Sequence, residues 1–304
     1  MTTRLVSIVT PCFNEHGNVE DLYEQVKAVF AALPQYEYEM IFIDNASTDG
    51  TQDVLRRVAA EDHAVKVILN TRNFGQIRSP FHAFLQSHGD AVITMSSDLQ
   101  DPPALIVDFL QKWEEGYEIV LGQKTASDES KLLYGIRTLY YRFVRRLADV
   151  DLLEHVTGFG LYAREVVEQF RTLDDPYPYM RGLISEFGHG IARIPYHQPK
   201  RHSGVTKNNF YTLYDLAMLG VTSHSKVPLR LATMMGFAGS MVSLLVGLVY
   251  LVYKLLYWSR ISVGIAPLVV GLFFFVSVQL LFLGVVGEYV GAIYTQVLKR
   301  PLVT

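Results

Sequence analysis

The sequence predicts an α/β domain with a mainly parallel sheet and flanking helices, followed by basic amphipathic segments and a C-terminal hairpin of two transmembrane helices. Two observations carry this prediction. The first half of the 304-residue chain alternates β-rich runs with segments whose apolar residues recur at helical spacing, as in successive strand–helix units. The stretch from about residue 231 to 298 is nearly free of charged residues.

The strands and helices of the first half follow one another at short intervals. Strands are expected at 4–12, 38–47, 64–70 and 90–96. Helices are expected at 18–33, 51–60 and 79–87. The first of these helices has one apolar face, made by Val19, Leu22, Val26, Val29, Phe30 and Leu33. Alternation of this kind favours a mainly parallel sheet.

Composition and missing motifs exclude several classes of protein. The net charge of −3 argues against a general nucleic-acid binder, which needs a basic surface. The single cysteine, Cys12, excludes an intramolecular disulfide and a multi-cysteine zinc site. No Gly-rich dinucleotide or P-loop motif follows an expected strand, which argues against a dehydrogenase and a P-loop enzyme. The N-terminus lacks the features of a signal peptide, so we expect the N-terminal part to stay in the cytosol.

Polar clusters follow the four expected strands. These clusters are Asn14–Glu15, Asp44–Asn45, Arg72–Asn73 and Asp98–Gln100–Asp101. In open parallel sheets, ligands bind beyond the carboxyl ends of the strands. A single cluster is explained by ordinary turn and capping chemistry, whereas four on one edge predict a binding site.

Asp98 and Gln100 offer the hard oxygen ligands that Mg²⁺ or Mn²⁺ takes. Because no Gly-rich phosphate loop is present, a divalent cation is the expected means of neutralising a diphosphate. The alternative is that the Asp98–Gln100 triplet only caps a helix. Asp101 has a similar alternative, since it precedes the Pro102–Pro103 pair at which a helix is expected to begin.

Two apolar segments, 231–253 and 264–294, are each long enough to cross a bilayer core, which needs about 20 helical residues. The alternative, a buried core helix, usually runs shorter and carries a polar stripe. Residues 254–263 are expected to form a short turn between the two spans. The positive-inside bias is weak, and the missing signal peptide leads us to expect both termini in the cytosol. Glu288 lies near the inner end of the second span, in either a functional or a structural role.

Two basic segments precede the spans. The segment 131–150 interleaves apolar residues with Lys131, Arg137, Arg142, Arg145 and Arg146. This pattern predicts a basic amphipathic helix in the headgroup region of an anionic leaflet, with a core-packed helix as the alternative. A second basic segment, 198–219, leads into the membrane, and attraction to the membrane surface alone would also explain its cations.

Several motifs occur together and in a fixed order. They are IVTPCFNE (8–15), IDNASTDGT (43–51), NTRNFG (70–75), SDLQDPP (97–103) and GVVGEYVGAIY (284–294). With these motifs the chain resembles the family 2 glycosyltransferases of the GT-A fold, and among them the polyisoprenyl-phosphate glycosyltransferases, such as dolichyl-phosphate mannose synthases and bactoprenol glucosyltransferases. The resemblance covers nearly the whole chain and implies a Rossmann-like catalytic domain.

The resemblance also implies roles for individual residues. The nucleotide-sugar-binding residues would be Pro11, Phe13, Glu15, Asp44, Arg72 and Ser96. The metal ligands would be Asp98 and Gln100, and the acceptor-phosphate-binding residues Arg137, Arg201 and Lys207. For Asp44 a strand-end cap stays open as the alternative, and for Arg72 a surface salt bridge.

The chain departs from the family pattern at two places. Ser96 stands where relatives usually have the first acid of D-x-D, which we expect to alter donor binding more than metal capture. Gly158 and Gly160 stand where relatives tend to have an acid with a catalytic role and an arginine. A lipid phosphate is already mostly dianionic at pH 7, because its second pKa is about 6, so it needs no general base. Glu186 and His155 are the candidate bases if one is required.

We therefore expect a membrane-bound glycosyltransferase that moves a sugar from a nucleotide diphosphate sugar to a polyprenyl phosphate, with Asp98 and Glu186 as catalytic candidates and Mg²⁺ or Mn²⁺ as cofactor. It would be a multi-pass protein of the inner (plasma) membrane with a cytoplasmic catalytic domain; self-association stays open. The expected divisions are a nucleotide-sugar-binding core (1–125), an acceptor and interface part (126–228), two spans (229–298) and a cytoplasmic tail (299–304). The alternatives are transfer to a lipid or glycan hydroxyl, and a nucleotide-sugar-binding pseudoenzyme or membrane scaffold.

Overall fold

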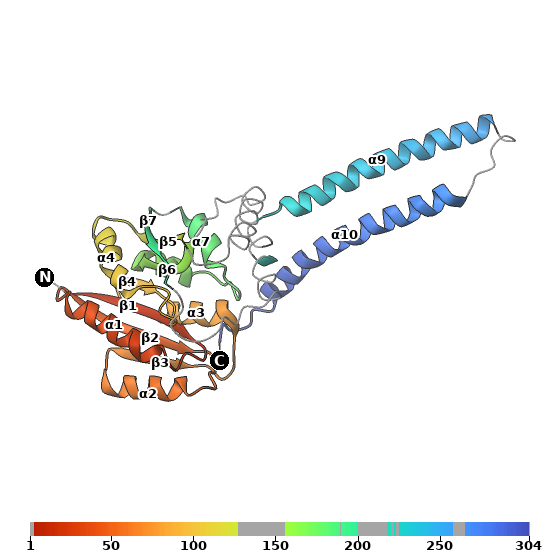
Figure 1. The fold of residues 1–304 in the computed structure, drawn as a ribbon. Helices are drawn as coiled ribbons and strands as arrows, with labels where there is room; N and C mark the ends of the chain where they lie inside the picture. Colours follow the sequence, from red (N-terminus) through yellow and green to blue (C-terminus); the bar gives the residue numbers. More distant parts are fainter. Residues whose placement is uncertain are drawn as a thin grey trace.

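The computed structural model describes residues 3–126, 156–188, 190–199, 218–219, 222, 225–257 and 265–303. In Figure 1 an α/β domain carries two long helices that project away from it. The helix expected at 131–150 and most of the second basic segment lie outside the described residues.

Within the described residues, seven strands form one sheet in the order β3-β2-β1-β4-β6-β5-β7. The first four strands are β1 (Arg4–Cys12), β2 (Tyr36–Asp44), β3 (Val65–Leu69) and β4 (Ala91–Thr94), and they run parallel. The other three are β5 (Ile119–Ala126), β6 (Val156–Ala163) and β7 (Ile191–His197). β6 runs antiparallel to both β4 and β5, while β5 and β7 are parallel. The predicted mainly parallel sheet is confirmed.

Helices cover both faces of the sheet. One apolar cluster holds the inward faces of α1 (Val19–Ala31), α2 (Thr51–Glu61) and α4 (Ile106–Glu114), which follows the 3₁₀ turn η1 (Pro103–Leu105). The other holds those of α3 (Gly75–Leu85), α6 (Arg164–Arg171) and α7 (Met180–Phe187). In β2, Met40 and Phe42 belong to the first cluster and Ile41 and Ile43 to the second. This alternation follows from the two-residue period of a strand.

The start of α3 differs from the expected position. The helix was expected over 79–87 but begins at Gly75, and Pro80 lies inside it. Its first turn is held by a partner distant in sequence, because the side-chain oxygen of Asn45 accepts a hydrogen bond from the Phe74 N–H at 2.8 Å. Local sequence does not reveal such a contact, and the polar residues before Ser79 resemble a loop.

Two long helices, α9 (Val227–Leu256) and α10 (Ile265–Val297), follow the domain (Figure 1). Among the described residues these two helices are long and apolar enough to cross a membrane, over 227–249 and 274–297. Neither stretch is buried within the chain, unlike the core helix of a soluble protein. α9 continues through Leu256, so the expected turn at 254–263 was placed too early.

Candidate active site

The loops that follow β1 to β4 meet at one edge of the sheet. In the strand register, Cys12 lies beside Asp44, and Asp44 lies beside Leu69. On the other side of β1, Val9 pairs with Thr94. The convergence of polar clusters that the sequence predicted is therefore confirmed.

Asn45, in the loop after β2, connects that loop to the loop after β3 through its side chain. Its Nδ2 donates to Oδ1 of Asn73 at 2.9 Å, and its Oδ1 accepts from Nδ2 of Asn70 at 3.2 Å. The loop after β1 is attached in the same way, because the Asn14 N–H donates to Oγ of Ser47 at 2.8 Å. These bonds give the edge a defined shape.

Three residues with side chains adopt left-handed backbone conformations at this edge. Asn14 has a φ of 56°, Ala46 of 62° and Leu99 of 59°. They lie in the loops after β1, β2 and β4. A left-handed conformation costs roughly 1–2 kcal/mol for such residues and persists where the surroundings enforce it, often at functional sites. Of the three, Leu99 is closest in the chain to the expected metal ligands, because it lies between Asp98 and Gln100.

The two carboxylate oxygens of the buried Asp44 have different surroundings. Oδ2 accepts hydrogen bonds from the Ser47 N–H at 3.0 Å and from Nε2 of Gln52 at 2.7 Å. Oδ1 is buried and has no hydrogen-bond partner among the described residues. Oδ2 thus performs the turn-capping role that was the alternative for Asp44, and Oδ1 stays available to a ligand donor.

Ser96 joins two carboxyl groups. Its Oγ lies 2.8 Å from Oδ1 of Asp98 and 2.7 Å from Oδ2 of Asp101. One hydroxyl proton cannot serve two carboxylates, so the second contact needs a proton on a carboxyl group. Burial raises the pKa of Asp101, against hydrogen bonds from Ser96 and Tyr196 that lower it. A protonated Asp101 would donate to Ser96, which then donates to Asp98.

The neighbouring serine, Ser97, makes a different contact. Its Oγ donates to the carbonyl of Pro11 at 2.9 Å and so ties the loop after β4 to β1.

Asp101 does not cap the following helix as one alternative proposed. Neither η1 nor α4 has a side-chain hydrogen bond at its N-terminus. Asp101 instead accepts from the Ser96 N–H at 2.9 Å and from the Tyr196 hydroxyl at 3.0 Å. It therefore fixes the loop after β4 against β7.

A cleft of about 380 Å³ opens beside this loop. Of the residues expected to form the site, those that line it are Pro11, Ser96, Asp98, Gln100 and Asp101. Lys124, Tyr179 and Gln198 also line it and were not expected. Lys124 lies near the end of β5, and its position depends on strand pairing that the sequence does not reveal.

The remaining expected residues lie elsewhere. Glu15 is buried, and its carboxylate accepts from Nδ2 of Asn18 at 2.6 Å, while Phe13 is half-buried in the loop after β1. Arg72 is exposed, with its guanidinium 4.1 Å from the centre of the Phe74 ring.

Other expected residues are on α7 or lie outside the described part. Glu186 is exposed on α7 and is not among the cleft-lining residues. Outside the described residues are Arg137, His155, Arg201 and Lys207.

The two glycines that depart from the family pattern have different surroundings. Gly158 lines the cleft, and a Cβ added there meets no atom of the described residues within 4 Å. At Gly160 a Cβ would lie 2.7 Å from the Val120 carbonyl oxygen and 2.8 Å from Leu121. An acid would therefore fit at Gly158, whereas strand packing excludes a side chain at Gly160.

The donor set fits a divalent cation that is shared with a substrate. Among the described residues no group of three or more His, Cys, Asp or Glu could hold a metal alone. Mg²⁺ typically takes one or two carboxylates and completes its coordination with water and substrate phosphates. Asp98 supplies a carboxylate, and the amide nitrogen of Gln100 donates to the Pro199 carbonyl at 3.4 Å, which leaves the amide oxygen as the metal-binding end.

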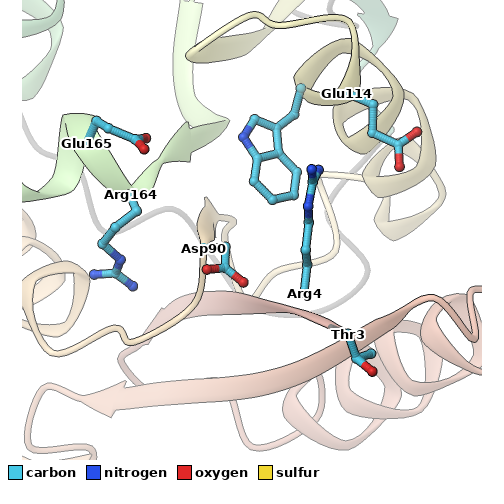
Figure 2. A pocket seen from close by; sticks show the side chains of 7 residues that line it. Thr3, Arg4, Asp90, Glu114, Arg164 and Glu165 are labelled. Atoms are coloured by element: carbon cyan, nitrogen blue, oxygen red, sulfur yellow. The ribbon is translucent and has the colours of Figure 1, made fainter. Parts of the chain in front are cut away.

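A larger cavity of about 610 Å³ lies at the amino ends of β1 and β4 (Figure 2). Several of its lining side chains serve structural contacts. Asp90 accepts from the Leu5 N–H at 2.9 Å, and Arg4 lies 5.0 Å from the Trp113 ring. Nε of Arg164 donates to a backbone carbonyl at 2.7 Å. This is the edge opposite to the one where open α/β sheets bind ligands, so the smaller cleft is the candidate active site.

Known proteins resemble this chain over most of its length. It is 33% identical over 297 residues to the SfII prophage-derived bactoprenol glucosyl transferase of Shigella flexneri, covering 97% of this chain and 96% of that protein. It is 31% identical over 297 residues to a prophage bactoprenol glucosyl transferase homolog of Escherichia coli, with the same coverages. The fold aligns with glucosyl-3-phosphoglycerate synthase from Mycobacterium tuberculosis in complex with Mn²⁺, UDP and phosphoglyceric acid, with a TM-score of 0.51, 19% identity and coverage of 72% of this chain and 76% of that one. At that identity the last likeness shows the fold alone.

The parallel β1–β4 core with the antiparallel β6 is a GT-A-like α/β fold. The family model described as glycosyl transferase family 2 matches residues 7–171. The chain belongs to this family and is a glycosyltransferase.

Proposed function

We propose that this glycosyltransferase moves a sugar from a nucleotide diphosphate sugar to a polyprenyl phosphate, with undecaprenyl phosphate as the expected lipid. The observation that carries the proposal is the cleft after β4, where Asp98, Gln100 and Lys124 line one space beside the open backbone of Gly158. The relatives named bactoprenol glucosyl transferases, which match nearly the full chain, support this class of acceptor.

Donor binding is assigned to the loops after β1, β2 and β4. The unpartnered Oδ1 of Asp44 suits an N–H or hydroxyl donor of the nucleoside. Asp98 and Gln100 would hold Mg²⁺ or Mn²⁺, which would neutralise charge on the departing diphosphate. Lys124 adds a positive charge in the same cleft and would stabilise the leaving group further.

The acceptor phosphate is its own nucleophile. One of its oxygens attacks the anomeric carbon as the bond from that carbon to the diphosphate oxygen breaks, and the nucleoside diphosphate leaves. A phosphate with a second pKa of about 6 has already lost its proton at pH 7, so no general base is needed. This agrees with the glycine at position 158. The cleft has room for an acidic side chain at this position, but the chain has none there. Direct attack inverts the anomeric centre.

The alternatives require features that the cleft does not favour. A hydroxyl acceptor needs a base, and the candidate Glu186 is exposed and does not line the cleft. A pseudoenzyme has no need of Asp98, Gln100 and Lys124 in one space. Both alternatives are tested by the experiment below.

The two apolar helices would anchor the catalytic domain at the cytoplasmic face of the inner membrane. A water-soluble donor and a membrane-embedded acceptor have to meet at the interface, and a soluble domain on a membrane hairpin provides that meeting point.

The proposal is tested with the full-length protein in lipid nanodiscs. Undecaprenyl phosphate, a panel of nucleotide sugars and Mg²⁺ or Mn²⁺ are supplied, and release of nucleoside diphosphate is measured with and without the lipid. We expect release that depends on the lipid and falls at least about 100-fold in Asp98→Ala.

Asp53→Ala is the matched control, because Asp53 is an exposed carboxylate on α2 that contacts only Arg56 on the same helix in the described chain. Donor binding without turnover across the panel would favour the pseudoenzyme. Full activity in Asp98→Ala would contradict the assigned metal site.

A further inference from the structure

Three arginines lie where α3 meets the chain segment that follows α10. Arg72 and Arg78 both lie against the buried ring of Phe74, with guanidinium carbons 4.1 and 5.6 Å from its centre. Arg300 follows α10, which ends at Val297. Within the described part of the chain, none of the three arginines forms an ion pair with a carboxylate.

Contacts on both sides of Arg300 hold the C-terminal segment against the domain (Figure 1). Before it, Nζ of Lys299 lies 2.5 Å from Oδ2 of Asp174. After it, the Pro301 carbonyl accepts a hydrogen bond from Arg78, and Leu302 packs against the apolar cluster of α3, α6 and α7. The chain thus brings an arginine from the far end of the sequence to α3.

The positive charges and one buried N–H donor of the cluster are suited to binding an anion. Nε of Arg78 is buried and has no hydrogen-bond partner among the described residues. Burial lowers the pKa of Arg78, and Arg72 and Arg300 lower it further, while Tyr177 opposes them. Repulsion among like charges and a buried N–H without a hydrogen-bond partner both cost free energy of folding. A bound anion offsets both costs. Guanidinium groups match the geometry of a phosphate, which accepts two N–H bonds from each.

We propose that Arg72, Arg78 and Arg300 bind the phosphate monoester of a membrane lipid. A lipid source is favoured over a free phosphate because Arg300 directly follows a helix apolar enough to cross a membrane, which places the cluster at the depth of the headgroups. The cluster adjoins the active-site cleft, because Gln76, Ile77 and Pro80 of the same helix α3 line that cleft. The inference rests on the proposed function in taking this lipid phosphate as the acceptor.

The test measures binding without turnover. Full-length protein in neutral detergent is titrated with farnesyl phosphate, farnesol, inorganic phosphate, phosphatidylglycerol and UDP, with no nucleotide sugar present. The main variant is Arg300→Gln, because the Arg300 side chain forms no hydrogen bond or ion pair with other described residues, so we expect its loss to leave the fold intact. We expect farnesyl phosphate to bind about tenfold more weakly to this variant, with UDP affinity unchanged.

Two further variants separate charge from structure. Arg300→Lys keeps the positive charge and should recover most of the affinity. Arg56→Gln removes an exposed arginine on α2, far from the cluster in sequence, and should bind like the wild type. Farnesol should bind weakly to every variant, since it lacks the phosphate.

The outcomes distinguish this inference from the proposed function. Equal farnesyl phosphate affinity in Arg300→Gln and wild type overturns the inference, and lipid-dependent transfer can still be present. Weakened UDP binding with unchanged farnesyl phosphate binding assigns the cluster to the donor and also overturns it. Phosphatidylglycerol or inorganic phosphate binding as tightly as farnesyl phosphate contradicts a lipid monoester site. Arg300-dependent binding in a protein that transfers no sugar supports the site and contradicts the proposed function.

Discussion

The hydroxyl of Ser96 lies 2.7 Å from a carboxylate oxygen of Asp101, and the same hydroxyl lies 2.8 Å from Asp98. The sequence shows Ser96 as the loss of an acid from a D-x-D motif. In the structure the serine hydroxyl links the two carboxyl groups by hydrogen bonds. A third carboxylate at this position would have to lie against both.

Ser96→Asp should therefore impair the protein, although it would complete the D-x-D pattern. Repulsion between the new carboxylate and Asp98 and the loss of the bridging hydroxyl should destabilise the loop after β4 by about 2 kcal/mol and raise the KM for the donor. Thermal unfolding and donor kinetics measure the two effects. Ser96→Ala is the control, because it removes the hydroxyl without adding charge and should be milder in both assays. A Ser96→Asp variant as stable as wild type and more active would refute this account of the serine.

Glu39 provides a pH prediction away from the active site. Its buried carboxylate accepts from the Ser7 hydroxyl at 2.5 Å and the His88 N–H at 2.7 Å, and it pairs with Lys66. Burial acts to raise the pKa of Glu39, but these partners outweigh it and the pKa is lowered. The stabilisation is therefore present above the unfolded-state pKa of about 4.3 and is lost as the pH falls through the lower folded-state value.

Glu39→Gln should lower stability at pH 7 by about 2 kcal/mol and by progressively less as the pH falls below about 4.3. Thermal unfolding of wild type and variant over this pH range measures the difference. Glu37→Gln on the same strand is the control, because Glu37 is exposed, and it should change stability little. A difference that does not depend on pH would show that Glu39 acts through packing alone.

Local patterns predicted some parts of the molecule and could not predict others. β1 to β4 were expected because each is a short apolar run followed by a polar turn, and all four occur near the expected positions. The pairing of β6 between β4 and β5 depends on contacts between distant segments, so neither its direction nor the place of Lys124 in the cleft could be read from the sequence. Asp98 and Gln100, the expected metal ligands, were picked out as near neighbours in sequence, and the structure adds the left-handed conformation of Leu99 between them.

Asp44→Asn should weaken donor binding with little loss of stability. The amide oxygen of asparagine can still accept from the Ser47 N–H, as Oδ2 does now. The amide nitrogen would replace the unpartnered Oδ1 and present a donor where the ligand is expected to donate. We expect about a tenfold higher Kd for the nucleoside diphosphate, measured by calorimetry, with a melting temperature close to that of wild type. Unchanged affinity would remove Asp44 from the proposed donor site.

Gly158 and Gly160 form a matched pair that separates the chemistry of the cleft from the packing of the sheet. Gly160→Ala should lower stability by about 1–3 kcal/mol, because its Cβ would lie 2.7 Å from the Val120 carbonyl oxygen. Gly158→Ala should change stability little, since no atom in the described part of the chain lies within 4 Å of the added carbon. Gly158→Asp then places a carboxylate in the cleft at small structural cost. If the acceptor is a phosphate dianion, that carboxylate has no proton to remove and repels the nucleophile, so lipid-dependent turnover should fall by about threefold or more. A clear rise in turnover in Gly158→Asp would mean that the wild-type reaction is limited by a missing base, and would favour a hydroxyl acceptor instead.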